Sequence, residues 1–434
     1  MLTGTGRLTF AGFKPTIRLL HTTPILAADH PQLWQLKDIQ RRMETNSDGN
    51  NYLIQVMARQ RQGQSPVSSE ADKLNSLSTL PQLQLIKPRN EILSELEKER
   101  PDLEEGSKKS LTILYRILKS YLVFFREGIT NVWRTWWDLR RTVYRGKQPY
   151  YVFDNGLGRG DKATGSARDK QLVLRPRSLN QVIGELATSV RCQQNVEGEK
   201  MWLFEQKDDQ EYIGITRKQL QTMIRNKYDA PRLPGFALLF ALLEELSILV
   251  CWVSPYITPM TCLFPRFMPR YFSRALQAQQ KLKKLRNGEL FESIASRNPF
   301  NMSVEECRSL SEVLMVNESF KWANCLESTD FMRQRLLQRY KEITLDNYLI
   351  IRDGGVNQLH PLELFTACLR RGLIDFEGLV RTIKENPDRY YTDFLDETKM
   401  RLDLTKFIVD FADRRNNIGL LGLYITAKPV EADG

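Results

Sequence analysis

The chain has 434 residues, of which 41% are hydrophobic and 26% are charged. A disordered chain has fewer apolar residues than this, and a polytopic transporter has fewer charged ones, so the composition excludes both classes. The 63 Lys and Arg residues outnumber the 52 Asp and Glu residues, and the net charge of +11 favours anionic partners such as nucleic acid, ribosomes or acidic lipid surfaces. The six cysteines and three histidines form no CxxC or HExxH motif, so we expect no metal site, no disulfide framework and no cofactor.

The N-terminus has the composition of a mitochondrial transit peptide over residues 1–28. It carries Arg7, Lys14 and Arg18, and no acidic residue precedes Asp29. We expect cleavage shortly after Arg18; the alternative is a disordered basic N-terminus. Residues 29–108 are polar and of mixed charge, which predicts a flexible N-terminal region with short helices.

A long helix is predicted over residues 109–147. Ser110 is a good N-cap, and the proline-free stretch from Leu111 to Arg145 repeats apolar residues at helical spacing. About 35 residues of helix would be about 52 Å long. Its aromatic and basic residues indicate a basic amphipathic helix on an anionic membrane surface. The alternative is an ordinary core helix with a solvated basic face.

Residues 148–212 predict a small α/β insertion. Strand character occurs at residues 150–153, 171–174, 201–204 and 212–215, and Ser178-Leu-Asn-Gln181 predicts a capped helix. The glycine-rich segment at residues 156–165 lacks the spacing of a phosphate-binding loop, so a surface loop is the better interpretation.

The stretch from Leu233 to Pro265 carries charge only at Glu244 and Glu245. It supplies the roughly twenty residues that cross a bilayer, and sliding the span to Leu246–Pro265 removes both acids but admits Pro255 and Pro259. We predict one membrane-spanning helix within residues 213–272, kinked near Pro255. The alternative is a buried helix of a soluble protein. Within a span the two glutamates are candidates for a proton-coupled ion pathway, and the alternative is that both lie near the interface and form ion pairs.

The C-terminal half is predicted to be all helical. A basic helix is expected over residues 271–292, and further helices begin at Ser303, Thr329 and His360. Pro361 at the first helical position and Gly372 after the last one are a start and stop pair in the right order. Two more helices are expected over residues 376–386 and 402–414.

Three segments resemble the LETM family of mitochondrial inner-membrane proteins. Gly214-Ile-Thr-Arg-Lys-Gln-Leu, the apolar stretch that ends in Leu263-Phe-Pro-Arg-Phe-Met-Pro269, and Gln280-Lys-Leu-Lys-Lys-Leu-Arg286 are similar to its membrane-proximal elements. Phe331 to Arg339, Arg352-Asp-Gly-Gly-Val356 and His360 to Leu373 are similar to its ribosome-binding domain. The chain looks like a divergent, fungal-type member, close to the factors that assist export of cytochrome oxidase subunits. It departs from typical members in the insertion at residues 148–212 and in lacking an EF-hand loop.

The resemblance implies a mainly α protein with one span and a 14-3-3-like helical domain over residues 273–434, which faces the mitochondrial matrix. This protein would be no enzyme. It would bind mitochondrial ribosomes, inner-membrane lipids and nascent mitochondrially encoded membrane proteins, and it could form homo-oligomers. Its function would be to assist insertion or export of respiratory-chain subunits, and the alternative is potassium/proton or other cation/proton exchange. The candidate ribosome contacts are Arg333, Arg335, Arg339, Lys341, Arg370 and Arg371. The membrane-proximal basic candidates are Arg266, Arg270, Lys281, Lys283 and Lys284.

Overall fold

The computed structural model describes residues 71–87, 89–99, 107–143, 150–153, 173–176, 178–194, 215–243, 257–264, 268–316, 328–386, 391–413 and 418–423. The expected transit peptide with Arg18, the glycine-rich segment at 156–165, both glutamates of the predicted span and Arg266 lie outside these residues. The strands expected at 201–204 and 212–215 also lie outside them, apart from Ile215.

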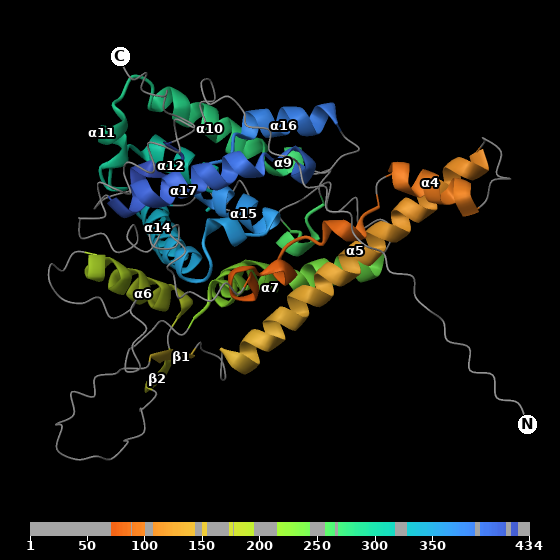
Figure 1. Ribbon diagram of the computed structural model, residues 1–434, viewed down its shortest axis with the longest axis horizontal. Helices are drawn as coiled ribbons and strands as arrows, with labels where there is room; N and C mark the ends of the chain where they lie inside the picture. The colour runs from red at the N-terminus through yellow and green to blue at the C-terminus, as the bar shows by residue number, and fades with distance from the viewer. Residues whose placement is uncertain are drawn as a thin grey trace, which may run out of the picture.

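The described part of the chain is mainly helical, as expected (Figure 1). Its helices before residue 250 are α3 (Ala71–Leu74), η1 (Leu77–Thr79), η2 (Leu83–Leu85), α4 (Arg89–Glu99), α5 (Ser107–Thr142), α6 (Leu179–Gln194) and α7 (Arg217–Leu243). The later ones are η4 (Met260–Cys262), α9 (Met268–Tyr271), α10 (Ser273–Leu285), α11 (Phe291–Ala295), α12 (Val304–Val313), α14 (Thr329–Arg352), η6 (Val356–Gln358), α15 (Pro361–Arg371), α16 (Phe376–Glu385), η7 (Tyr391–Phe394), α17 (Glu397–Asp413) and η8 (Ile418–Leu420).

Strands β1 (Tyr150–Phe153) and β2 (Val173–Pro176) form an antiparallel pair, in which Tyr150 lies opposite Pro176 and Phe153 opposite Val173. The second strand begins two residues later than expected. The helix that follows is capped as predicted: the Ser178 backbone N–H donates to Gln181 Oε1 at 3.1 Å, and the Gln181 N–H donates to Ser178 Oγ at 3.3 Å.

Helix α6, which lies within the expected insertion at residues 148–212, packs into the main core. Leu179, Val182, Ile183 and Leu186 are buried in the same apolar cluster as the helices of the C-terminal half. Helix α6 contacts α14 directly. The sequence alone cannot predict this, because the period of an amphipathic helix does not specify its partner.

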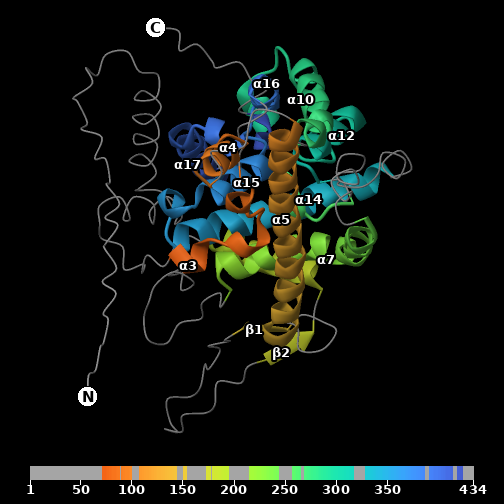
Figure 2. The ribbon, with the colours of Figure 1, turned by 90° about the vertical axis from the view of Figure 1, so that its right-hand side faces the viewer.

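Helix α5 is the longest element and lies along one side of the helical body (Figure 2). Its 36 residues give a length of about 54 Å. Phe124, Phe125 and Val132 are buried on the face that meets α7 and η4. Gly128 allows this close approach, because a Cβ at this position would lie 2.6 Å from Cys262 Sγ.

Between Leu233 and Pro265 the described residues differ from the expected membrane-spanning helix. Leu233 to Leu243 form the last part of α7, which begins at Arg217 and carries two internal prolines, Pro231 and Pro234. Residues 257–264 form a turn and η4, and they pack against α5, so a continuous membrane helix does not extend to Pro265. Among the helices that the structure describes, none is both long enough and apolar enough to cross a membrane.

Residues 71–99 pack against the fold, whereas the sequence predicted a flexible region with short helices. Leu74 and Leu80 are buried near α7, and Ile92 and Leu96 of α4 bury themselves with Ile113 of α5. The spacing of these few apolar residues is too irregular to be recognised as a core pattern. The short helices were expected, and their burial was not.

The C-terminal helices agree with their start and stop signals. His360 is the N-cap of α15 with Pro361 after it, and Gly372 ends the helix in the left-handed region at φ +69°. The helix expected from Thr329 is α14, which continues to Arg352 because no Gly or Pro interrupts it.

Candidate functional site

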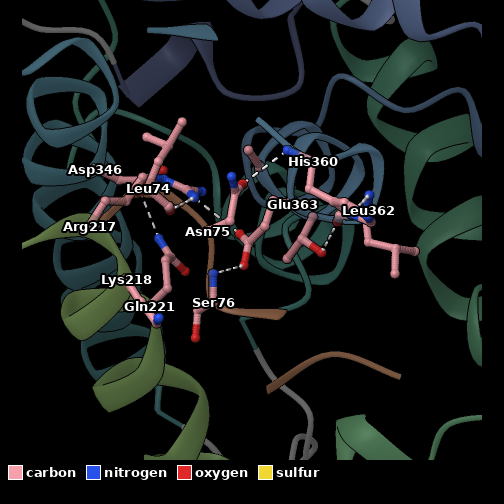
Figure 3. A network of polar contacts seen from close by, with 12 residues as sticks. Leu74, Asn75, Ser76, Arg217, Lys218, Gln221, Asp346, His360, Leu362 and Glu363 are labelled. Carbon is pink, nitrogen blue, oxygen red and sulfur yellow. Dashed lines mark hydrogen bonds and ion pairs between the residues drawn. The ribbon is translucent and has the colours of Figure 1, made fainter. Parts of the chain in front are cut away.

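A buried network of charged side chains joins α7, α14 and α15 to the segment around Ser76 (Figure 3). Glu363 is at its centre and is fully buried. Arg225 donates to both of its carboxylate oxygens, at 2.7 and 2.8 Å, and Arg217 donates to one at 3.1 Å. The Ser76 backbone N–H completes the set at 2.9 Å. A bidentate guanidinium pair of this kind is a strong and directional contact.

Asp346 connects the same network to the C-terminal end of α15. It accepts from Arg217 Nε at 2.9 Å, from Gln221 at 2.7 Å and from Arg371 at 2.8 Å. Arg371 also donates to Asn347 Oδ1 at 2.6 Å and is fully buried. These contacts fix α7 against α14 and α15.

Both carboxylates of this network are held in the ionised form. Burial alone would raise the pKa of Glu363, but the Arg225 and Arg217 guanidiniums outweigh burial and lower this pKa to about 2. The pKa of Asp346 is also lowered, because Arg217 and Arg371 outweigh the effect of its burial. Neither group exchanges a proton near neutral pH, so the network stabilises the fold and is not an acid–base centre.

The segment before η1 is held to this network by further hydrogen bonds. Asn75 Oδ1 accepts from the His360 N–H at 2.9 Å, and Asn75 Nδ2 donates to the Gln358 carbonyl at 3.1 Å. Arg217 Nη1 donates to the Leu74 carbonyl at 2.8 Å. Residues far apart in the sequence therefore meet at the start of α15.

Three of the predicted ribosome contacts form ion pairs within the fold: Arg339 and Arg371 are buried, and Arg370 is partly buried. Arg371 belongs to the network above. Arg339 is 6% exposed and pairs with Glu342 at 3.2 Å, and Arg370 pairs with the same carboxylate at 2.6 Å. The carboxylates that pair with these arginines, Glu342 and Asp346, both belong to α14.

The other basic candidates are more accessible. Arg333 is half-buried and donates to the Pro299 carbonyl at 3.1 Å, and Arg335 lies over the Phe331 ring at 4.4 Å. Lys341 is exposed on the same helix. The membrane-proximal candidates that the structure describes are exposed or half-buried: Arg270, Lys281, Lys283 and Lys284.

The outer face of α5 carries exposed aromatic and basic side chains. Leu111, Tyr115, Trp133 and Trp137 have 64%, 61%, 55% and 41% of their surface exposed. Tyr115 and Trp133 are about five helical turns apart and so lie on the same side of the helix. The guanidiniums of Arg140 and Arg141 lie 4.6 and 5.0 Å from the Trp136 and Trp137 ring centres. Helix α5 is thus a core helix on one face and an aromatic and cationic surface on the other.

Sequence reasoning missed the centre of the buried network. Glu363 and Arg217 were placed only within segments that resemble the LETM family, and neither they nor Arg225 were predicted to pair with one another. The available signal was weak: Glu363 lies among apolar residues of a short helix. Its partners, Arg217 and Arg225, lie more than a hundred positions away, so no local pattern pairs them.

Comparison with known proteins finds one family. Residues 169–353 match the model of the pentamidine resistance factor domain, which covers less than half of the chain. This range includes β2, α6, α7 and all elements up to α14, and it crosses the boundaries that we expected at residues 212 and 272. No curated protein and no solved structure gives a significant match. The resemblance to the LETM family and to 14-3-3 proteins therefore stays a prediction.

Proposed function

We propose that this protein attaches to the mitochondrial inner membrane through the outer face of α5 and holds mitochondrial ribosomes there, assisting insertion or export of mitochondrially encoded respiratory-chain subunits. The observation that carries the proposal is the exposed aromatic and cationic face of α5. The matched domain is consistent with this proposal but does not specify a function.

The chemistry of this face suits an anionic lipid surface. Tryptophan and tyrosine prefer the boundary between head groups and acyl chains, and arginine is attracted to acidic head groups. Each arginine near such a surface contributes about 1 kcal/mol. The buried face of α5 stays packed on α7 and η4, so the helix can lie on the membrane without leaving the fold.

The ribosome contact rests on the accessible basic residues of α10 and α14. Lys281, Lys283 and Lys284 belong to α10, and Arg333, Arg335 and Lys341 belong to α14. Such cations can bind the phosphates of ribosomal RNA without reading its sequence. We place the helical domain in the matrix, because the mitochondrial ribosomes are there.

Vesicle flotation tests the membrane part of the proposal. The full chain should float with vesicles of phosphatidylcholine and cardiolipin and not with pure phosphatidylcholine. Replacing Arg140 and Arg141 by Gln should remove about 2 kcal/mol, or about thirtyfold in partitioning. The matched control replaces Arg381 and Lys384, two exposed cations of α16, by Gln. Equal loss in both variants would show a nonspecific charge effect and refute the role of α5.

Sedimentation with mitochondrial ribosomes tests the second part. Binding should weaken steeply as salt rises, because phosphate contacts release counterions. Neutralising Arg333, Arg335 and Lys341 together should reduce binding, while the α16 control should not. Absence of cosedimentation at low salt would refute the ribosome contact and leave the membrane contact standing.

Extraction of isolated mitochondria with carbonate at high pH tests how the chain is held. Attachment through α5 alone predicts release, and a membrane span predicts retention. The alternative function, cation/proton exchange, depends on Glu244 and Glu245, which lie outside the described residues. It stays a prediction, and replacing both by Gln in a mitochondrial swelling assay tests it.

A further inference from the structure

Three aromatic side chains around the first half of α14 each have a cation close to the ring. The pairs, with the distance from the cation to the ring centre, are Arg335 and Phe331 at 4.4 Å, Arg333 and Phe300 at 5.8 Å, and Lys227 and Tyr228 at 5.7 Å. A cation within about 6 Å of a ring centre is attracted to the face of the ring. We call these six residues the basic aromatic surface.

The pairs lie on elements that pack against one another. Helix α14 contacts α12, α6 and α7, and the last two lie beside it in Figure 1. Arg333 Nε donates to the Pro299 carbonyl at 3.1 Å, which fixes α14 to the turn that carries Phe300. Lys227 Nζ donates to Asn180 Oδ1 at 2.8 Å and so joins α7 to α6. Hydrogen bonds therefore hold two of the three cations in place.

The lysine of this surface lies within electrostatic reach of α14. Partial burial lowers the pKa of Lys227, and the charges of Arg339 and Arg335 lower it further. The carboxylate of Glu342 acts in the opposite direction. The cations of α7 and α14 thus form one cluster.

Both phenylalanine rings are open to solvent. Phe331 has 48% of its surface exposed and Phe300 has 54%, although a guanidinium lies close to each ring. Neither ring belongs to an apolar core cluster of the described residues. A single exposed apolar side chain is ordinary on a protein surface, but here two aromatic rings are exposed within one basic region.

Positive charge predominates around the rings. The accessible cations are Lys227, Arg333, Arg335 and, further along α14, Lys341. Asp330 lies 3.5 Å from Arg333 and is itself 82% exposed. Glu342 is buried and is held by Arg339 and Arg370, so it is turned away from solvent. An anionic partner therefore suits this surface.

We propose that the basic aromatic surface binds unpaired, single-stranded nucleic acid. Bases stack on the rings of Phe331 and Phe300, and phosphates contact the neighbouring cations. Proteins that bind single strands combine cationic surfaces with aromatic rings in this way, and arginine planes add to the stacking. The proposal deepens the ribosome contact proposed above and rests on it for the identity of the strand, which would be a loop or an end of ribosomal RNA.

The arrangement of the rings favours a nucleic acid over a lipid surface. A helix that lies on a membrane carries its apolar residues as one stripe along one face. Here the rings come from α14, from the turn before α12 and from α7, and a cation lies at each ring. Binding to phosphates alone would need the cations and not the exposed rings.

Fluorescence anisotropy with labelled oligonucleotides and the full chain tests the proposal. A mixed-sequence RNA of about 12 nucleotides is compared with its own duplex and with DNA of the same sequence. We expect the single strand to bind more tightly than the duplex, and inorganic polyphosphate of equal charge to compete weakly. A preference for RNA or for DNA identifies the natural strand. Duplex binding as tight as that of the single strand, or full displacement by polyphosphate, would overturn the proposal.

Substitution of each ring locates the contact. Phe331→Ala and Phe300→Ala should each weaken binding of the single strand about tenfold and leave its salt dependence unchanged, because no phosphate contact is removed. Both rings are exposed, so these variants should fold, and the two positions lie on different elements. Phe331→Leu keeps an apolar side chain without a ring and should also weaken binding; full binding by this variant would contradict stacking. The matched control is Leu290→Ala, since Leu290 is 78% exposed.

Sedimentation with mitochondrial ribosomes separates this proposal from the ribosome contact. If both alanine variants bind the single strand as well as the unmodified chain while ribosomes still cosediment, the ribosome contact stands and stacking is refuted. If the single strand binds as expected and no ribosome cosediments, the ribosome contact is refuted and the basic aromatic surface stands. Loss of vesicle flotation in both alanine variants, with unchanged binding of the single strand, would assign the rings to the membrane and refute stacking.

Discussion

Replacing Glu363 by Gln should destabilise the fold more than any surface change. The glutamine side chain has one acceptor oxygen in place of two, and its amide group would face a guanidinium. Arg225 would then lose its counter-charge, and Arg217 would keep only Asp346. Breaking a buried ion pair by removing one partner costs about 3–5 kcal/mol.

The pKa of Glu363 gives an independent magnitude. It falls from an ordinary value of 4.5 to about 2, and each unit corresponds to about 1.4 kcal/mol. The ionised carboxylate thus contributes on the order of 3 kcal/mol. Because the folded pKa is the lower one, this contribution is complete above about pH 4.5 and is lost as the pH falls toward 2.

Urea unfolding followed by far-ultraviolet circular dichroism measures the effect. Tryptophan fluorescence is less suitable, because the tryptophans of the described residues all lie in α5. At pH 7 the Glu363→Gln midpoint should fall by roughly 1 M, and the difference from the unmodified chain should shrink below pH 4. The matched control is Glu397→Gln, which removes a half-exposed pair with Arg401 and should cost less than about 1 kcal/mol. A Glu363→Gln loss no larger than that of the control would refute the reasoning.

Three further changes test other parts of the fold. Gly372→Ala puts a Cβ 2.9 Å from Gly422 Cα at φ +69°, and it should lower the free energy of unfolding by at least about 1 kcal/mol in the same urea assay; an unchanged value would contradict the close approach. Gly128→Ala should displace η4 from α5 and cost about 1–3 kcal/mol, and faster hydrogen exchange in both elements would show it, whereas unchanged exchange would contradict this packing. Burial raises the pKa of the Cys368 thiol to about 12, so iodoacetamide at pH 8 should modify Cys368 only after unfolding; modification of the folded chain would show that it is accessible.

The local signals of the sequence predicted individual helices well. Ser178 with Gln181, and His360 with Gly372, mark helix ends where the structure has them. The long helix over Leu111 to Thr142 followed from its apolar spacing alone. These features depend on residues within one or two helical turns of each other, so one sequence is enough to predict them.

The arrangement of the helices did not follow from the sequence. The sequence assigned Arg370 and Arg371 to a surface, because cations are common at a helix C-terminus. In the structure they contact carboxylates of α14, about 25 positions away. The arginine and glutamate spacing on each helix is equally compatible with a solvated face. The packing of α7, α14 and α15 against one another decides whether these charges are solvated or buried.

The partners in the buried network lie far apart in the sequence, and this affects both folding during synthesis and the behaviour of fragments. The contact between Ser76 and Glu363 spans 287 positions, and that between Arg225 and Glu363 spans 138. During synthesis Arg217 and Arg225 of α7 leave the exit tunnel well before Asp346 and Glu363 are made, so the native packing of this region cannot form until the last quarter of the chain is synthesised. A fragment that starts at Ser273 would carry Asp346 and Glu363 without Arg217 and Arg225, and we expect it not to form the native packing of the intact protein.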